Sequence, residues 1–67
     1  MNSAGGTVVV RYRPGEVELQ AATPAPGFDV EIEDAGPPRV RVDFESDDSE
    51  SSVEAEWKDG ALEVEVD

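Results

Sequence analysis

The stretch that decides the fold is Val53-Glu54-Ala55-Glu56-Trp57-Lys58-Asp59-Gly60-Ala61-Leu62-Glu63-Val64-Glu65-Val66. Apolar and charged residues alternate at a period of two on both sides of Asp59-Gly60, as in a strand with one buried and one solvated face. Asp-Gly is a preferred dipeptide for the two-residue turn of a β-hairpin. The segment therefore predicts an antiparallel hairpin. Its apolar pairs are Trp57–Leu62, Ala55–Val64 and Val53–Val66.

Four further stretches alternate in the same way and are joined in two pairs. The six apolar halves are Val8/Val10/Tyr12, Val17/Leu19/Ala21, Phe28/Val30/Ile32, Val40/Val42/Phe44, Val53/Ala55/Trp57 and Leu62/Val64/Val66. A two-residue turn at Pro14-Gly15 predicts the pairs Arg13–Glu16, Tyr12–Val17, Arg11–Glu18 and Val10–Leu19. Pro-Gly is not a favoured dipeptide for such a turn, so a bulge or a slightly longer loop is the alternative. A five-residue turn at Asp34–Pro38 predicts the pairs Glu33–Arg39, Ile32–Val40, Glu31–Arg41, Val30–Val42 and Phe28–Phe44.

The segments between these hairpins interrupt the alternation. Ala22–Gly27 holds two prolines, which lack the N–H donor that a ladder needs. Glu45–Ser52 is polar throughout, and we expect it to be the most mobile segment. No stretch has the apolar spacing of an amphipathic helix. The sequence thus predicts an all-β fold of three consecutive antiparallel hairpins (six strands) that form a small β-sandwich, with a small barrel as the alternative.

The length of 67 residues is that of one domain. We expect Met1–Gly6 to be a flexible leader and residues 7–67 to form a single β-domain. The chain has no cysteine and no histidine, so we expect neither a disulfide nor a structural zinc site. Stability has to come from an apolar core that contains few aromatic residues.

The composition is strongly acidic, with 17 Asp and Glu against five Lys and Arg and a net charge of −12. Nucleic acid is disfavoured as a partner because phosphates are bound by Lys and Arg. An anionic membrane surface is disfavoured for the same reason. The simplest interpretation is a solvated surface that resists aggregation. A monomer, or a weak dimer through open strand edges, is the expected oligomeric state.

The outward side of the Val53–Val66 hairpin carries only glutamates in its middle. Glu56 stands opposite Glu63 and Glu54 opposite Glu65, and like charges in these positions are destabilising. One resolution is a neighbouring strand, either the first or the fourth, that brings its arginines among these glutamates. The alternative is a cationic partner or a divalent ion.

Catalytic and metal-binding signals are weak, and we expect no enzyme, no cofactor and no metal. Catalysis by His or Cys is excluded, and a pair of carboxylates acting on a sugar needs a cleft that so small a β-domain hardly provides. The acidic segment Asp43–Glu50 could offer oxygen ligands to calcium, but it lacks the residue order of an EF-hand loop.

Several motifs and their spacing resemble a family of small extracytoplasmic domains in actinobacteria, whose function is poorly defined. The matching segments are Gly6–Arg11, Ala22–Phe28, Gly36-Pro37, Val40–Asp48 and Val53–Gly60. The resemblance implies an extracytoplasmic or secreted parent protein. It also implies that relatives carry a disulfide between the positions of Tyr12 and Trp57, so an aromatic pair here would replace a covalent bridge. Packing in the core is one interpretation of the two rings, and an exposed aromatic platform is the other.

We therefore expect a non-enzymatic extracytoplasmic β-module that binds a protein or a ligand within a larger envelope protein. An engineered cysteine-free scaffold without biological activity is one alternative, and a calcium-dependent β-module is another.

Overall fold

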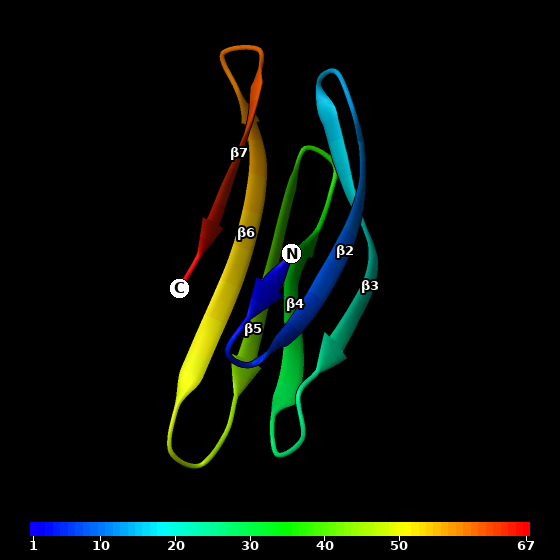
Figure 1. Cartoon of the computed structure of the whole chain (residues 1–67). Helices are drawn as coiled ribbons and strands as arrows, with labels where there is room; N and C mark the ends of the chain where they lie inside the picture. Colours follow the sequence, from blue (N-terminus) through cyan, green and yellow to red (C-terminus); the bar gives the residue numbers. More distant parts are fainter.

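The computed structural model describes all 67 residues and contains seven β-strands and no helix (Figure 1). The strands are β1 (Asn2–Ser3), β2 (Gly6–Arg13), β3 (Glu16–Pro24), β4 (Asp29–Ala35), β5 (Arg39–Glu45), β6 (Glu50–Lys58) and β7 (Ala61–Val66). No element is a helix of the length and apolarity needed to cross a membrane.

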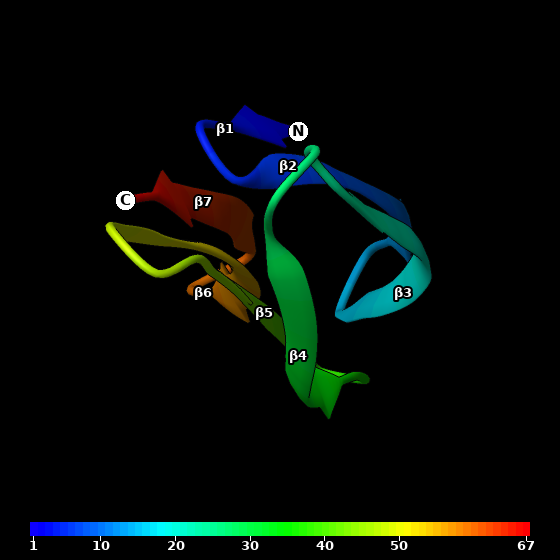
Figure 2. The ribbon, with the colours of Figure 1, turned by 90° about the horizontal axis from the view of Figure 1, so that it is seen from below.

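The strands form two antiparallel sheets that lie face to face (Figure 2). One sheet has the order β1-β2-β3 and the other the order β4-β5-β6-β7, so every ladder joins strands that are consecutive in the chain. The all-β class and the two-sheet arrangement are confirmed. The barrel alternative is wrong, because no ladder connects the two sheets. The number of strands is seven rather than six, because Asn2–Ser3 forms the short additional strand β1 beside β2.

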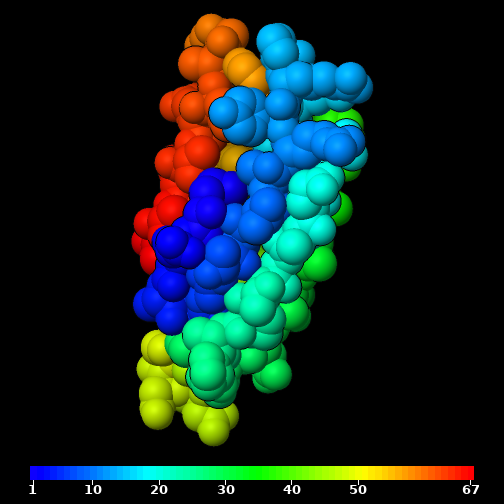
Figure 3. Space-filling model, turned by 45° about the vertical axis from the view of Figure 1, so that its right-hand side comes forward, coloured from blue at the N-terminus to red at the C-terminus, as the bar shows by residue number.

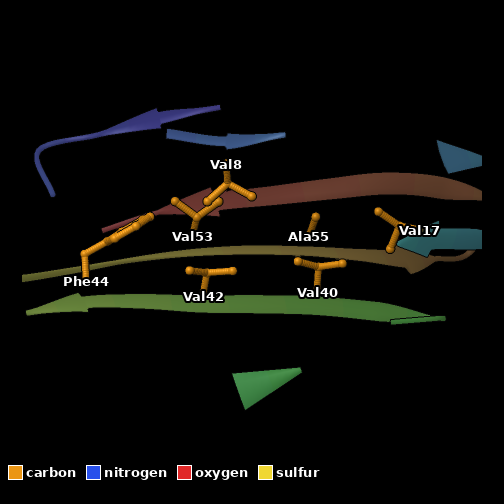
Figure 4. Close-up of a cluster of buried hydrophobic side chains, with 7 residues drawn as sticks. All are labelled: Val8, Val17, Val40, Val42, Phe44, Val53 and Ala55. Atoms are coloured by element: carbon orange, nitrogen blue, oxygen red, sulfur yellow. The ribbon is translucent and has the colours of Figure 1, made fainter. Parts of the chain in front are cut away.

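The core lies between the two sheets and is small. Its seven fully buried apolar residues come from both layers (Figure 4): Val8, Val17, Val40, Val42, Phe44, Val53 and Ala55. The central strands β5 and β6 contribute most of them, because both are flanked within their sheet and covered by β2 and β3. Burial of one such Val or Phe side chain stabilises the fold by roughly 1.5–3 kcal/mol.

The predicted registers of the first and third hairpins are confirmed at all of their predicted pairs. Beyond Val10–Leu19, however, a β-bulge changes the alternation of β3. Gln20 is the extra residue, so Ala22 rather than Ala21 lies opposite the buried Val8. The prediction that Ala21 faces the core is therefore wrong: Ala21 is exposed and Ala22 packs against the core. An extra residue in one strand moves every later side chain to the other face.

The predicted register of the second hairpin is wrong by two residues on one strand. Val30 pairs with Phe44 and Ile32 with Val42, and Asp34 and Ala35 continue the strand as partners of Arg41 and Val40. A second bulge at Glu33 makes this possible, and the turn shortens to Gly36–Pro38. The five-residue loop assumed from the sequence would have placed Asp34 and Ala35 outside the sheet.

The polar segment Glu45–Ser52 is mostly strand rather than connection. β5 and β6 pair along their whole length, from Arg39–Glu56 to Glu45–Glu50. The loop between them is only residues 46–49, closed by a hydrogen bond from the Ser46 N–H to the Ser49 carbonyl (2.8 Å). Ser51 faces the core and is buried. Because it is polar, the apolar alternation in the sequence starts only at Val53, and the start of β6 was not recognised.

Residues 1–6 differ from the expected flexible leader, because they are packed onto the two sheets. The N–H of Val8 donates to the Met1 carbonyl (2.7 Å), and the Met1 nitrogen donates to the Val8 carbonyl (2.7 Å). The N–H of Gly5 donates to the Ser51 hydroxyl (3.0 Å) in a buried position. Glycine is required at position 5, where an added Cβ would lie 2.5 Å from the Phe44 Cβ.

The three-stranded sheet is too narrow to cover the four-stranded one. Val30 and Ile32 on β4, and Val64 and Val66 on β7, stand beside buried neighbours but keep 39–52% of their surface exposed. β1 has only two residues, so β2 and β3 provide the cover, and they lie over β5 and β6. Both edges of the larger sheet are therefore open on their inner side.

Candidate interaction surface

The outer face of the four-stranded sheet carries most of the negative charge of the molecule. Side chains alternate between the two faces of a sheet, so those on the outer face point away from the buried residues Val40, Val42, Phe44, Val53 and Ala55. The acidic residues at outward ladder positions are Asp29, Glu31, Asp34, Asp43, Glu45, Glu50, Glu54, Glu56, Glu63 and Glu65. The basic residues on this face are Arg39, Arg41 and Lys58. The face is strongly anionic as a result.

The outer face of the three-stranded sheet is balanced by comparison. Arg11 lies opposite Glu18, and Arg13 lies opposite Glu16. The second pair forms a salt bridge of 2.9 Å. The charge of the chain is therefore not spread evenly over its surface, as a general solubilising role would suggest. It is concentrated on one of the two sheets.

One glutamate of the ladder, Glu54, is paired with arginines of the neighbouring strand, in agreement with one of the two sequence interpretations. β5 lies beside β6, and the Arg39 guanidinium is 2.8 Å from a Glu54 carboxylate oxygen. Arg41 lies 3.5 Å from the same carboxylate and 3.4 Å from Asp43. The strand that supplies the arginines is the fourth stretch predicted from the sequence. The first stretch, with Arg11, lies in the other sheet.

The glutamates of β7 remain without such a partner. Glu56 is paired with Lys58 at 3.4 Å, but no basic group lies within ion-pair distance of Glu63 or Glu65. The Glu56 carboxylate is the main cause that raises the pKa of the Lys58 ammonium group, and the charges of Glu63 and Glu65 raise it further. The anionic field at this edge of the sheet is therefore only partly compensated.

A second group of carboxylates gathers at the opposite edge, around the bulge of β4. The neighbouring Glu31 raises the pKa of Glu33, first by a hydrogen bond between the two side chains and then by its charge. Asp43 raises it further, and Arg41 lowers it. The bulge brings these acids together, because it inserts Glu33 into the outward row of β4.

The outer face is hollowed over β5, β6 and β7. One hollow of about 380 Å³ is lined by Arg41, Asp43, Glu45, Glu50, Ser51, Ser52 and Asp67. A second, of about 510 Å³, shares Arg41, Ser52 and Asp67 with it and extends along Glu54 and β7. Carboxylate and hydroxyl oxygens in such a hollow can accept hydrogen bonds from ammonium or guanidinium groups. The lining includes no histidine and no cysteine.

The acidic serine-containing loop does not assemble a cation site. Ser46 and Ser49 hydrogen bond to one another across residues 46–49, which makes the loop a tight turn. Nowhere in the structure do three or more acidic side chains converge in a geometry that could hold a metal ion. The calcium interpretation of Asp43–Glu50 therefore has no structural observation in its favour.

Tyr12 and Trp57 both lie beside the first residues of β3, at the turn end of the first hairpin. Tyr12 is the ladder partner of Val17, and the Trp57 indole N–H donates to the Glu16 carbonyl (2.7 Å). Trp57 packs against the core, in agreement with the core interpretation. For Tyr12 that interpretation is wrong, since 61% of its surface is exposed. Its position at the strand end lies beyond the cover of the second sheet.

Comparison of the chain with protein-family models, with curated proteins and with solved structures finds no match.

Proposed function

We propose that the chain is a non-enzymatic β-module that binds a cationic protein partner through the outer face of β4–β7. The observation that carries the proposal is the concentration of charge on this one sheet, while the other sheet is balanced by cross-strand pairs. Clefts and faces of one sign attract oppositely charged partners and raise association rates. The hollow beside Arg41 is lined by the carboxylates of Asp43, Glu45 and Glu50, which can accept hydrogen bonds from a basic side chain.

An extracytoplasmic location within a larger envelope protein is part of the proposal and is supported by the sequence resemblance alone. It is tested by expressing the parent protein with an epitope tag beside this domain and treating intact cells with protease. Loss of the tag signal without lysis is the expected result. A tag that resists protease until the cells are lysed would contradict the location.

The binding is tested with a fluorescent octa-arginine peptide, by anisotropy at low and at physiological salt. We expect binding that weakens as salt is added, because exposed charges are screened over about 8–10 Å at physiological ionic strength. The double variant Glu45→Gln/Glu50→Gln removes two charges from the hollow and should weaken binding. The matched control Glu16→Gln/Glu18→Gln removes two charges from the other sheet and should leave binding nearly unchanged.

Two outcomes would contradict the proposal. If both double variants weaken binding equally, only the net charge matters and the outer face is no site. If no binding is detected at low salt, the alternative of a scaffold without binding activity is favoured. A melting temperature that rises with millimolar calcium would favour the calcium-dependent alternative instead.

A further inference from the structure

β7 leaves one complete side of its backbone without a hydrogen-bonding partner. It is the edge strand of the four-stranded sheet. Ser52 and Asp67 exchange both backbone hydrogen bonds (3.2 and 2.8 Å). Since hydrogen-bonded pairs alternate along an antiparallel ladder, Glu63 and Glu65 also bond to β6. Leu62, Val64 and Val66 consequently direct their N–H and C=O groups away from β6, on the side where no further strand is paired with β7.

The other edges of the two sheets are interrupted. β3 has the bulge at Gln20 and ends in Pro24, which has no N–H to offer. β4 has the bulge at Glu33. β2 is paired with Met1 at Val8. The ladder of β7 runs without interruption from Val53–Val66 to Lys58–Ala61, and the strand contains neither proline nor glycine. Figures 2 and 3 show β7 on the side of the molecule where β1 and β2 of the other sheet also lie.

The side chains of β7 divide into an apolar row and an anionic row. Val64 and Val66 lie on the core side and are 44% and 49% exposed. Glu63 and Glu65 lie on the outer side and have no ion-pair partner. A strand added beside β7 would cover the two valines with one set of its side chains. Its other set would stand opposite the two glutamates.

We infer that β7 is the docking edge for an extended segment of the partner protein, in which Val, Ile or Leu alternates with Lys or Arg. The segment adds to the sheet as an antiparallel strand, with apolar residues opposite Leu62, Val64 and Val66 and basic residues opposite Glu63 and Glu65. Backbone hydrogen bonds at an open edge supply affinity in such complexes, and the alternate side chains supply specificity. The inference rests on the proposed function and specifies its partner.

A second copy of this chain does not fit the same edge. Antiparallel pairing of β7 with another β7 would place glutamates opposite glutamates, and like charges in these positions are destabilising. Charged residues on an edge strand are a common device against such self-association. The charge pattern therefore favours a basic strand over a homodimer.

The test uses the peptide TVKVKVT, its scrambled form TVVVKKT and its acidic form TVEVEVT. Titration is followed by NMR of the 15N-labelled chain. We expect TVKVKVT to bind about tenfold more tightly than TVVVKKT, since only alternation satisfies both rows of side chains. The amides of Leu62, Val64 and Val66 should show the largest shifts and become protected from hydrogen exchange.

Three variants locate the site. Glu63→Lys/Glu65→Lys should lose binding of TVKVKVT by about tenfold or more and gain binding of TVEVEVT. The matched control Glu31→Lys/Glu33→Lys makes the same change of charge at the opposite edge and should retain the preference for TVKVKVT. Val64→Pro removes an outward N–H but none of the bonds between β6 and β7, and should weaken binding. Circular dichroism establishes that each variant is folded.

The outcomes separate the inference from the proposed function. If TVKVKVT and TVVVKKT bind equally and no β7 amide is protected, the edge is no docking site, whereas a cationic partner of the outer face is retained. If neither peptide binds at low salt, the inference about β7 is overturned, and the titration with octa-arginine decides the proposed function separately. If the chain dimerises through β7 in sedimentation at neutral pH, the argument from charge is wrong.

Discussion

Substitution of Gly5 by alanine tests how firmly the N-terminal residues are held on the core. A Cβ at this position would lie 2.5 Å from the Phe44 Cβ and 3.1 Å from the Phe28 ring, and it would also collide with the Ser51 hydroxyl. Carbon atoms in contact are normally about 3.5–4 Å apart. The chain around Gly5 must therefore move by about an ångström, or β5 and β6 must yield.

Overpacking of this kind costs about 1–3 kcal/mol. A domain of this size is stable by roughly 3–10 kcal/mol, so the loss is a large part of the total. For a small domain, each kcal/mol lost from the free energy of unfolding lowers the melting temperature by about 4–8 °C. We therefore expect the Gly5→Ala variant to melt roughly 5–20 °C below the unsubstituted chain. Thermal unfolding followed by circular dichroism measures the shift, and urea unfolding provides the free energy.

The control is a combination with Ser51→Ala. This substitution alone removes the acceptor of the Gly5 N–H and should be destabilising. Combined with Gly5→Ala it also removes one of the colliding atoms, so the double variant should lose less than the two single losses together. An unchanged melting temperature for Gly5→Ala would mean that residues 1–6 are a loose leader after all. Strict additivity would mean that the two residues do not touch.

Other substitutions probe the core, the junction between the sheets and the acidic face. Phe44→Ala leaves a cavity at a completely buried ring and should cost about 3–5 kcal/mol, measured by urea unfolding. Trp57→Phe removes the indole N–H that is bonded to the Glu16 carbonyl (2.7 Å). This change should lower the free energy of unfolding by about 1–3 kcal/mol, measured by urea unfolding followed by circular dichroism. Glu31 raises the pKa of Glu33 in the folded chain, so the folded state binds a proton at Glu33 more readily than the unfolded state does. The folded state therefore becomes more stable as the pH falls through this pKa. Glu33→Gln should therefore stabilise the chain at neutral pH, and its advantage should disappear on acidification. An equal advantage at pH 7 and pH 4 in melting curves would contradict the origin assigned to this shift.

Turn chemistry explains which registers could be predicted from the sequence. Asp59-Gly60 is a preferred two-residue hairpin turn, and Pro14-Gly15 also closes a two-residue loop. Because a short loop determines which residues pair, both flanking hairpins agree with expectation. The segment at Gly36–Pro38 leaves the loop length undetermined, and the bulge at Glu33 shifted the pairing. A bulge changes the face of every later residue without any distinct residue type to announce it.

Alternation predicts the face of a side chain but not whether another layer covers that face. Val64 and Tyr12 lie on the core side of their strands, as predicted, yet both are largely exposed. The length of β1 and the width of the smaller sheet decide this, and neither follows from the local pattern. The candidate surface was predictable in part: the glutamate ladder followed from the sequence, whereas the strand that supplies its arginines, the first or the fourth, was left open. The isolation of Glu63 and Glu65 required knowledge of the strand order.

The order of strands also has a consequence for how the chain folds. Every ladder connects neighbouring strands, and only the segment between Pro24 and Asp29 passes from one sheet to the other. Folding of β-proteins is usually slow because distant segments must meet, and its rate rises as contacts become more local. Each sheet of this chain can form by pairing of its strands outward from the turns that connect them. The packing of the two sheets against each other is then the one step that requires contacts between distant segments. The single tryptophan, Trp57, donates a hydrogen bond from one sheet to the Glu16 carbonyl of the other. Its fluorescence should therefore report the packing of the two sheets separately from the formation of the strands.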